Sequence, residues 1–230
     1  MDAVLAEIAT GHRTNTSGMV TDMAILHQAT LSPSKAELLS AYLPHVDGLG
    51  VGGHDDLALV GAYRFDDPAG DVGIETHLIA TPDGRVIQMP LTYRAAPLDG
   101  AEDWLITTLE HSALGTRWVY DGCGDPVYVS ELVRTIIEGD TQVELEVLTP
   151  DGTIERDNTV FVQGSGSDEA APAITSVVTS RSGTTSTIAE ADLSVVVHHV
   201  LTPGPAPESP HLAGTWKGVD KAHTMATLSS

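Results

Sequence analysis

Apolar and polar residues alternate along residues 57–65, 72–80 and 85–94, which is the pattern of strands that bury one face. The first two runs are joined by residues 66–70 (DDPAG), and the last two by residues 81–84 (TPDG). Proline presets the backbone of such turns, and glycine accepts the positive φ that they need. We therefore expect these three strands to form an antiparallel meander.

Further strands are expected on either side of the meander. Residues 25–31 are short, apolar and β-prone, and residues 104–108 and 117–120 are apolar and rich in aromatic side chains. Pro90 lies inside the third strand of the meander and has no amide to donate, which predicts an edge strand or a bulge there. Such an edge would be free to pair two copies of the chain.

Two helices are predicted from their end signals. A serine–proline pair begins the first helix and an aspartate–proline pair begins the second, because proline is tolerated at the first helical position. Apolar residues at helical spacing follow each pair. Pro44 ends the first helix, and Gly139 is suited to the C′ position of the second. The two capping pairs are Ser32-Pro33 and Asp125-Pro126.

The second half of the chain is β-rich and less regular. Strands are expected at residues 142–148, 159–163, 173–180 and 193–201, the first two of them as a hairpin on a second TPDG turn. Residues 164–172 are rich in glycine, serine and acidic residues, which is typical of a flexible linker.

These patterns divide the chain into four parts. We expect an α+β fold in which a curved antiparallel sheet is covered by helices and followed by a smaller β-rich unit, because this arrangement buries all the apolar stripes at once. The expected parts are a disordered or non-native extension at residues 1–22, a first domain at 23–140, the β-rich unit at 141–217 and a flexible tail at 218–230.

The composition limits the partners. The 230 residues include 11 Lys and Arg against 32 Asp and Glu, a formal net charge of −21 that would repel nucleic acid and anionic lipid. No apolar run approaches the roughly 18 residues that a membrane span needs. Cys123 is the single cysteine, so no internal disulfide is available; this is usual for cytoplasmic proteins, and we expect a cytoplasmic location.

Several motifs that resemble functional sites have a structural explanation. Residues 48–53 fit G-x-G-x-x-G, but a helix precedes them and a strand follows, whereas dinucleotide binding needs the reverse order. Residues 54–56 (HDD) are adjacent and diverge, and His198 and His199 point to opposite faces of a strand, so no metal is expected. Cys123 lies between aspartates that raise its pKa. We therefore assign no catalytic residue and no cofactor.

One candidate surface remains. Glu75 and His77 lie two apart on the polar face of one strand, as either a shallow polar site or a solvated ladder. Trp104 and Trp118 are suited to stack against a sugar ring, although a chain with 4% aromatic residues also needs them for its core. Arg94 completes this candidate polar and aromatic surface.

A series of short motifs lies between residues 23 and 138. In their order they resemble the N-terminal cap domain of bacterial maltokinases. The resemblance implies a cystatin-like topology. In those kinases the cap precedes a two-lobed phosphotransferase that makes maltose 1-phosphate for glucan synthesis, and the cap supplies no catalytic residue. The motifs are Tyr42-Leu-Pro44, Gly73–Leu78 (GIETHL), Gln88–Arg94 (QMPLTYR), Pro97-Leu98, Trp104–Ile106 (WLI), Val119–Asp121 (VYD) and Asp125-Pro126.

Residues 174–208 resemble the opening strands of the kinase N-lobe in a degenerate form. Thr175–Val178 (TSVV) and Pro203-Gly-Pro205 are similar to the family's segments, but residues 196–199 (VVHH) stand where the resemblance places a phosphate-holding lysine. The chain also has neither an H-G-D-x-H catalytic loop nor an Asp-Phe-Glu metal-binding segment. We therefore expect no phosphotransferase activity from the chain alone.

Three functions follow from these observations. The first is a non-catalytic cap-like protein that acts by binding or assembly in maltose, trehalose or α-glucan metabolism. The second is an enzyme, or a subunit of one, that completes a sugar-kinase or glucan-branching activity with a partner chain. The third is a structural oligomer paired at the edge around Pro90. The expected partner is accordingly a protein of α-glucan metabolism or another copy of the chain.

Overall fold

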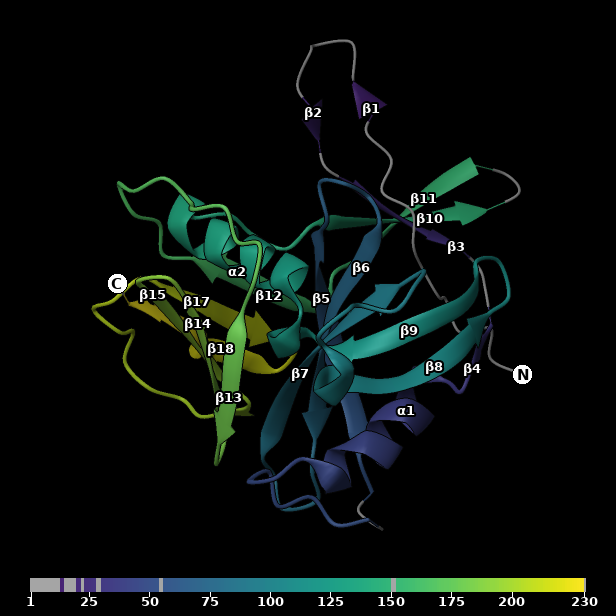
Figure 1. The fold of residues 1–230 in the computed structure, drawn as a ribbon, viewed down its shortest axis with the longest axis horizontal. Coiled ribbons are helices and arrows are strands. Elements are labelled where there is room, and N and C mark those ends of the chain that lie inside the picture. Colours follow the sequence, from purple (N-terminus) through teal and green to yellow (C-terminus); the bar gives the residue numbers. More distant parts are fainter. Residues whose placement is uncertain are drawn as a thin grey trace.

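The computed structural model describes residues 13–14, 20–21, 23–27, 30–53, 56–149 and 152–229, and two large antiparallel sheets dominate this part (Figure 1). The first sheet curls around a helix and has the order β4-β8-β9-β7-β6-β5, with β16 added beside β7. Its strands are β4 (Leu31–Ser32), β5 (Ala58–Asp66), β6 (Val72–Ala80), β7 (Val86–Arg94), β8 (Leu105–His111), β9 (Gly115–Asp121) and β16 (Val200–Leu201).

The second sheet has the order β12-β17-β18-β15-β14-β13. Its strands are β12 (Val160–Gly164), β13 (Val178–Ser182), β14 (Thr185–Glu190), β15 (Leu193–His198), β17 (His211–Trp216) and β18 (Val219–Ser229). Two smaller sheets are formed by β3 (Met23–His27) with β10 (Glu144–Thr149) and β11 (Gly152–Arg156), and by β1 (Arg13–Thr14) with β2 (Val20–Thr21).

The helices of the described residues are few and short. They are α1 (Lys35–Tyr42) and α2 (Pro126–Glu138), with the 3₁₀ turns η1 (Leu43–His45), η2 (Glu102–Trp104) and η3 (Gly122–Gly124). Among the described residues, none of these helices is long and apolar enough to cross a membrane. The fold is therefore mostly antiparallel β with helices on a curled sheet, as the sequence predicted in outline.

Helix α2 begins and ends as predicted. The Asp125 side chain accepts a hydrogen bond from the Val127 amide at 3.0 Å, Pro126 is the first helical residue, and Gly139 adopts the left-handed conformation with φ 66°. Helix α1 begins two residues later than predicted. Its N-cap is Ser34, which forms a capping box with Glu37. A capping box needs a glutamate or glutamine three residues after the N-cap; Glu37 stands there for Ser34, whereas Lys35 stands there for Ser32.

The first sheet is covered on both faces. Leu38 and Leu39 of α1 pack against Met89 and the rest of one face. On the other face, α2 and the second sheet share a core that includes Leu132 and Val197. This double cover explains why nearly every residue of β6 and β7 is buried, although the sequence alternates.

The meander formed by β5, β6 and β7 is confirmed, but β7 is not an edge strand. Pro90 faces Thr76 of β6. On its other side, β7 pairs with β9 from Leu91 onward and with β16 at Val86 and Ile87. Pro90 falls between these two partners, so the amide that it lacks interrupts no ladder.

The second half of the chain is more ordered than its pattern predicted. The expected flexible tail is strand β18, which lies between β17 and β15. Strand β10 forms its hairpin with β11, whereas β12, predicted as the hairpin partner, pairs with β17. Strands β14 and β17 were not predicted at all. Within the extension expected at residues 1–22, Arg13–Thr14 and Val20–Thr21 form the paired strands β1 and β2, and the rest of that extension, like His54 and Asp55, lies outside the described residues.

Candidate functional site

Glu75 and His77 are buried against α1, so the expectation of a solvated ladder is wrong. Only 6% of Glu75 and 3% of His77 is exposed. The Glu75 carboxylate lies 2.5 Å from Lys35 Nζ and 3.0 Å from His77 Nε2, and Arg64 Nη1 is 3.9 Å away. Because Lys35 is the first residue of α1, this ion-pair cluster attaches the helix to the sheet.

The neighbouring groups in this cluster determine the protonation state of Glu75. Burial alone would raise the pKa of Glu75, but its electrostatic interactions with Lys35, His77 and Arg64 outweigh this effect and hold the pKa well below its ordinary value. Burial raises the pKa of the neighbouring Tyr93 hydroxyl, which lies 3.4 Å from His77 Nε2. The carboxylate is therefore a permanent anion with internal partners, not a proton donor.

Arg94 is paired inside the molecule as well. Its Nε donates to Asp125 Oδ2 at 2.7 Å and its Nη2 to Asp125 Oδ1 at 2.6 Å, while Thr92 Oγ1 donates to the same carboxylate at 2.7 Å. Asp125 is fully buried and caps α2. The bidentate pair thus fixes the start of α2 on β7.

Trp104 and Trp118, the candidate surface for stacking a sugar ring, lie in different surroundings. Trp104 packs so closely over Gly124 that a Cβ at this glycine would collide with the indole, and the Arg181 guanidinium lies 5.7 Å from its ring centroid. Trp118, on β9, pairs with Arg94 in the register and is half-buried. Among the described rings, the aromatic contacts join Tyr63 to Phe65 and Trp216 to His223.

A buried polar network that the sequence did not reveal connects the two large sheets. Asp121, at the end of β9, accepts hydrogen bonds from the Tyr42 hydroxyl at 3.2 Å, from the Cys123 amide at 3.0 Å and from Arg181 Nη2. Arg181 belongs to β13 of the second sheet, and its Nε donates to Ser186 Oγ at 3.1 Å. The residues of this polar network are far apart in the sequence, so no local sequence pattern could have indicated that they pair.

The network continues to His199. Its Nε2 lies 2.7 Å from Ser186 Oγ, and its Nδ1 lies 3.1 Å from the backbone carbonyl of Gln88 on β7. Because the carbonyl can only accept, Nδ1 donates to it and Nε2 accepts from the serine hydroxyl. This resembles a nucleophile–base pair, but Ser186 and His199 are both 0% exposed. A substrate cannot reach them, so their contact is structural.

Cys123 and its surroundings fit the structural role that the sequence indicated. The thiol is fully buried, and burial together with the charge of Asp121 raises its pKa well above the ordinary value. A protonated thiol is a poor nucleophile and a poor metal ligand. Within the part of the chain that the structure describes, no group of three or more His, Cys, Asp or Glu side chains could hold a metal ion.

An open groove of about 440 Å³ runs between α1 and β8. Its floor includes Tyr42, whose hydroxyl points to Asp121; burial and this carboxylate raise the tyrosine pKa. The groove offers one carboxylate and one imidazole among apolar side chains, so it suits an apolar side chain better than a phosphate. It is lined by Pro33, Glu37, Leu38, Ala41, Tyr42, His45, Ile106 and Thr107.

Comparison with known proteins supports the resemblance over the centre of the chain. Residues 48–125 match the family model of the maltokinase N-terminal cap domain, from the loop before β5 to the capping residue of α2. The match contains Glu75, Arg94 and Asp121, and it excludes the whole of the second sheet. No curated protein matches the chain.

Proposed function

We propose that this protein is a non-catalytic module, related to the maltokinase cap, that acts by binding or assembly in maltose, trehalose or α-glucan metabolism. The match over residues 48–125 supports the link to a maltokinase-related cap and to carbohydrate metabolism. One observation supports the non-catalytic part of the proposal. Within the matched segment, the carboxylates of Glu75, Asp121 and Asp125 are engaged in internal ion pairs.

Acid–base catalysis needs a group that a substrate can reach and whose pKa lies near the working pH. Glu75 has its pKa held far below this range, and Cys123 has its pKa raised far above the value that a nucleophile needs. Asp121 and Asp125 are 0% exposed and have cationic partners. These groups connect secondary-structure elements to one another. Their structural role supports a module that acts by binding through its surface and not by catalysis.

The finer expectations about the fold belong to the same proposal. We infer a cystatin-like topology for the first sheet and a degenerate kinase N-lobe origin for residues 174–208. In support of the second, His199 occupies the region where a phosphate-holding lysine would stand, and it is buried with Ser186 and Gln88 as its partners. A neutral imidazole in that place would not hold a triphosphate. A cytoplasmic location is part of the proposal too.

The test is a phosphotransfer assay with the purified full-length chain. We expect no transfer of labelled phosphate from Mg-ATP to maltose, trehalose or glucosamine above the blank without protein, whereas an added hexokinase with glucose shows that the conditions support transfer. Phosphorylated sugar formed by the pure chain, at a rate that falls in Asp121→Asn or Glu75→Gln, would contradict the proposal. Transfer that needs a second protein would favour the subunit hypothesis.

A further inference from the structure

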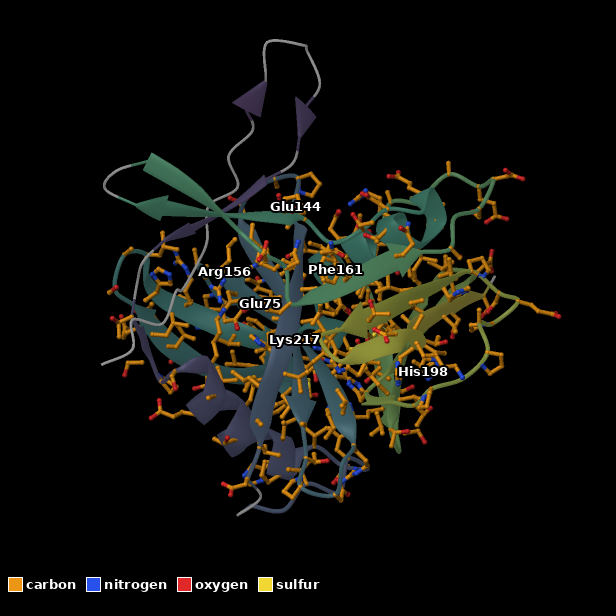
Figure 2. The ribbon with its side chains drawn as sticks, turned by 180° about the vertical axis from the view of Figure 1, so that it is seen from behind. Glu75, Glu144, Arg156, Phe161, His198 and Lys217 are labelled. Atoms are coloured by element: carbon orange, nitrogen blue, oxygen red, sulfur yellow. The ribbon has the colours of Figure 1, made fainter. Side chains whose placement is uncertain are left out.

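We propose that the outer face of the second sheet binds a neutral, hydroxyl-rich carbohydrate chain. One face of this sheet packs on α2 and the first sheet, through residues such as Val195 and Leu212. The opposite face is open and faces the viewer in Figure 2, where Phe161 and His198 are labelled. We call this open surface, formed by the outward residues of the six strands, the hydroxyl face.

Short hydroxyl side chains recur across the hydroxyl face. One row takes a residue from each of β13, β14, β15, β18 and β17, namely Ser180, Thr187, Val196, Thr227 and His211, which are paired successively in the register. Strands in a sheet are about 4.8 Å apart, so this row presents side chains at regular intervals. Such spacing suits a ligand with repeated polar groups.

A second row repeats this composition. Ser182, Thr185 and His198 are paired in the register of β13, β14 and β15. Burial lowers the pKa of His198 below its ordinary value, so its imidazole is uncharged at neutral pH and can both donate and accept a hydrogen bond. A third row is formed by Gln163, Ala213 and Thr224, of which Thr224 adds a hydroxyl, because the Gln163 Nε2 already donates to the Gly139 carbonyl at 2.6 Å.

The rows of the hydroxyl face are uncharged, whereas the chain as a whole is strongly acidic. The chain carries 32 Asp and Glu, yet the outward residues of these rows are uncharged. Among the described residues of this sheet, charged side chains lie near the hairpin turns, with Glu190 and Asp192 between β14 and β15 and with Lys217, Asp220 and Lys221 around the turn between β17 and β18. An exposed sheet face usually alternates charged residues for solubility, so a large neutral face indicates a neutral partner. Nucleic acid and other polyanions would meet repulsion from the net charge of −21.

A hollow at one end of the face provides a place for a sugar ring. It encloses about 320 Å³, and Phe161, which is 53% exposed, lies at its side. Thr141, Gln142 and Thr215 also line this hollow, and the Gln142 Oε1 accepts a hydrogen bond from the Val162 amide at 2.7 Å. The apolar face of a pyranose packs on an aromatic ring while its hydroxyls reach polar groups, and few polar groups among apolar ones are typical of small-molecule sites.

A second copy of the chain is the main alternative occupant. Two copies would bring together molecules that each carry a net charge of −21, and the hydroxyl face has no cation in its rows to offset this repulsion. A carbohydrate chain carries no charge and supplies a hydroxyl for each Ser and Thr. The choice of an α-glucan among neutral carbohydrates rests on the proposed function.

The test is native affinity electrophoresis of the full-length chain in gels that contain glycogen, dextran or laminarin. We expect at least one polysaccharide to retard the wild type, and Phe161→Ala to weaken the interaction by about fivefold or more, since aromatic contacts contribute about 1 kcal/mol. Phe161→Trp should retain the retardation. Leu59→Ala, which also shortens an exposed apolar side chain (48% exposed) but lies on β5 outside this face, should leave it unchanged.

A second variant tests the centre of the face. Thr187→Asp places a charge in the longest row without touching the hollow, and it should also weaken binding. Retardation that neither variant alters, or a wild type that no polysaccharide retards, would overturn the inference while the phosphotransfer result still decides the proposed function. A dimer in light scattering that Phe161→Ala abolishes would overturn it in favour of a second copy. Conversely, phosphotransfer by the pure chain would leave this binding result intact.

Discussion

Asp121 joins three parts of the chain through a single carboxylate. It receives the Tyr42 hydroxyl from the end of α1, the Arg181 guanidinium from β13 and the backbone amide of Cys123. Asp121 is 0% exposed, and the Arg181 side chain is 15% exposed. A buried ion pair has only a modest net effect on stability when it is intact, but it is costly when one partner is removed, because the other charge stays buried alone.

Asp121→Asn should therefore destabilise the protein strongly. We expect the free energy of unfolding to fall by about 3 kcal/mol or more, measured by urea denaturation. The matched change Asp83→Asn breaks an ion pair with Arg85 in which the aspartate side chain is 57% exposed, and it should leave the free energy of unfolding close to that of the wild type, because solvent screens such a pair. Equal losses for the two variants would show that the Asp121 pair is no more important than a surface pair.

His199 should make stability depend on pH. Burial lowers the pKa of His199 below its ordinary value of 6.5, so the unfolded chain binds a proton more readily than the folded chain. Stability should accordingly be complete above about pH 6.5 and decline as the pH falls below it, by at most about 1.4 kcal/mol per pH unit. His199→Gln should show a smaller decline in urea midpoint between pH 7.5 and 5.5, whereas His45→Gln, at an exposed position, should follow the wild type.

Sequence patterns predicted the face of the strand on which Glu75 and His77 lie, but not that this face is buried. Glu75 and His77 share one face of β6, as their spacing indicated, but α1 covers that face. A charged residue in an alternating strand normally faces water, and the burial of Glu75 depends on partners that include the distant Lys35 as well as His77 and Arg64. Arg181 was missed for the same reason, since its partner lies sixty residues away in the sequence.

At the scale of elements, local signals were sufficient for the two ends of α2 and insufficient for the second sheet. The Asp125-Pro126 start and the Gly139 end of α2 involve neighbouring residues, so the sequence contains the whole motif. Strand β18 shows no simple alternation, because its pairing with β17 is shifted between Leu212 and Ala213 and the inward positions change phase there. The shift made an ordered central strand resemble a flexible tail.

Gly164 tests the contact between α2 and the second sheet. A Cβ at this position would collide with the backbone carbonyl of Thr135 in α2. Gly164→Ala should therefore separate β12 from the helix and lower the free energy of unfolding by about 3 kcal/mol. Gly53→Ala is the matched control, since an added Cβ there meets nothing within 4 Å. Thermal denaturation of both variants measures the difference, and a Gly164→Ala protein as stable as the control would contradict this packing.

At the scale of the whole molecule, the two large sheets behave as one structural unit. Strand β16, from the second half of the chain, pairs with β7. The Gln88 amide donates to the carbonyls of His198 and Met225, which belong to the second sheet. Because these contacts connect distant segments, the sequence boundary expected near residue 140 remains a prediction about domains, whereas the shared core is a feature of the structure.

The central claim is that the buried polar residues serve to hold these two sheets together, and native-state hydrogen exchange followed by mass spectrometry tests it most directly. Peptides from β6 and from β15 should exchange with the same free energy of opening, and that free energy should fall equally in both for Asp121→Asn, because the sheets unfold as one cooperative unit. Opening of β15 at a much lower free energy than β6, with Asp121→Asn affecting only one of them, would show that the network does not couple the sheets.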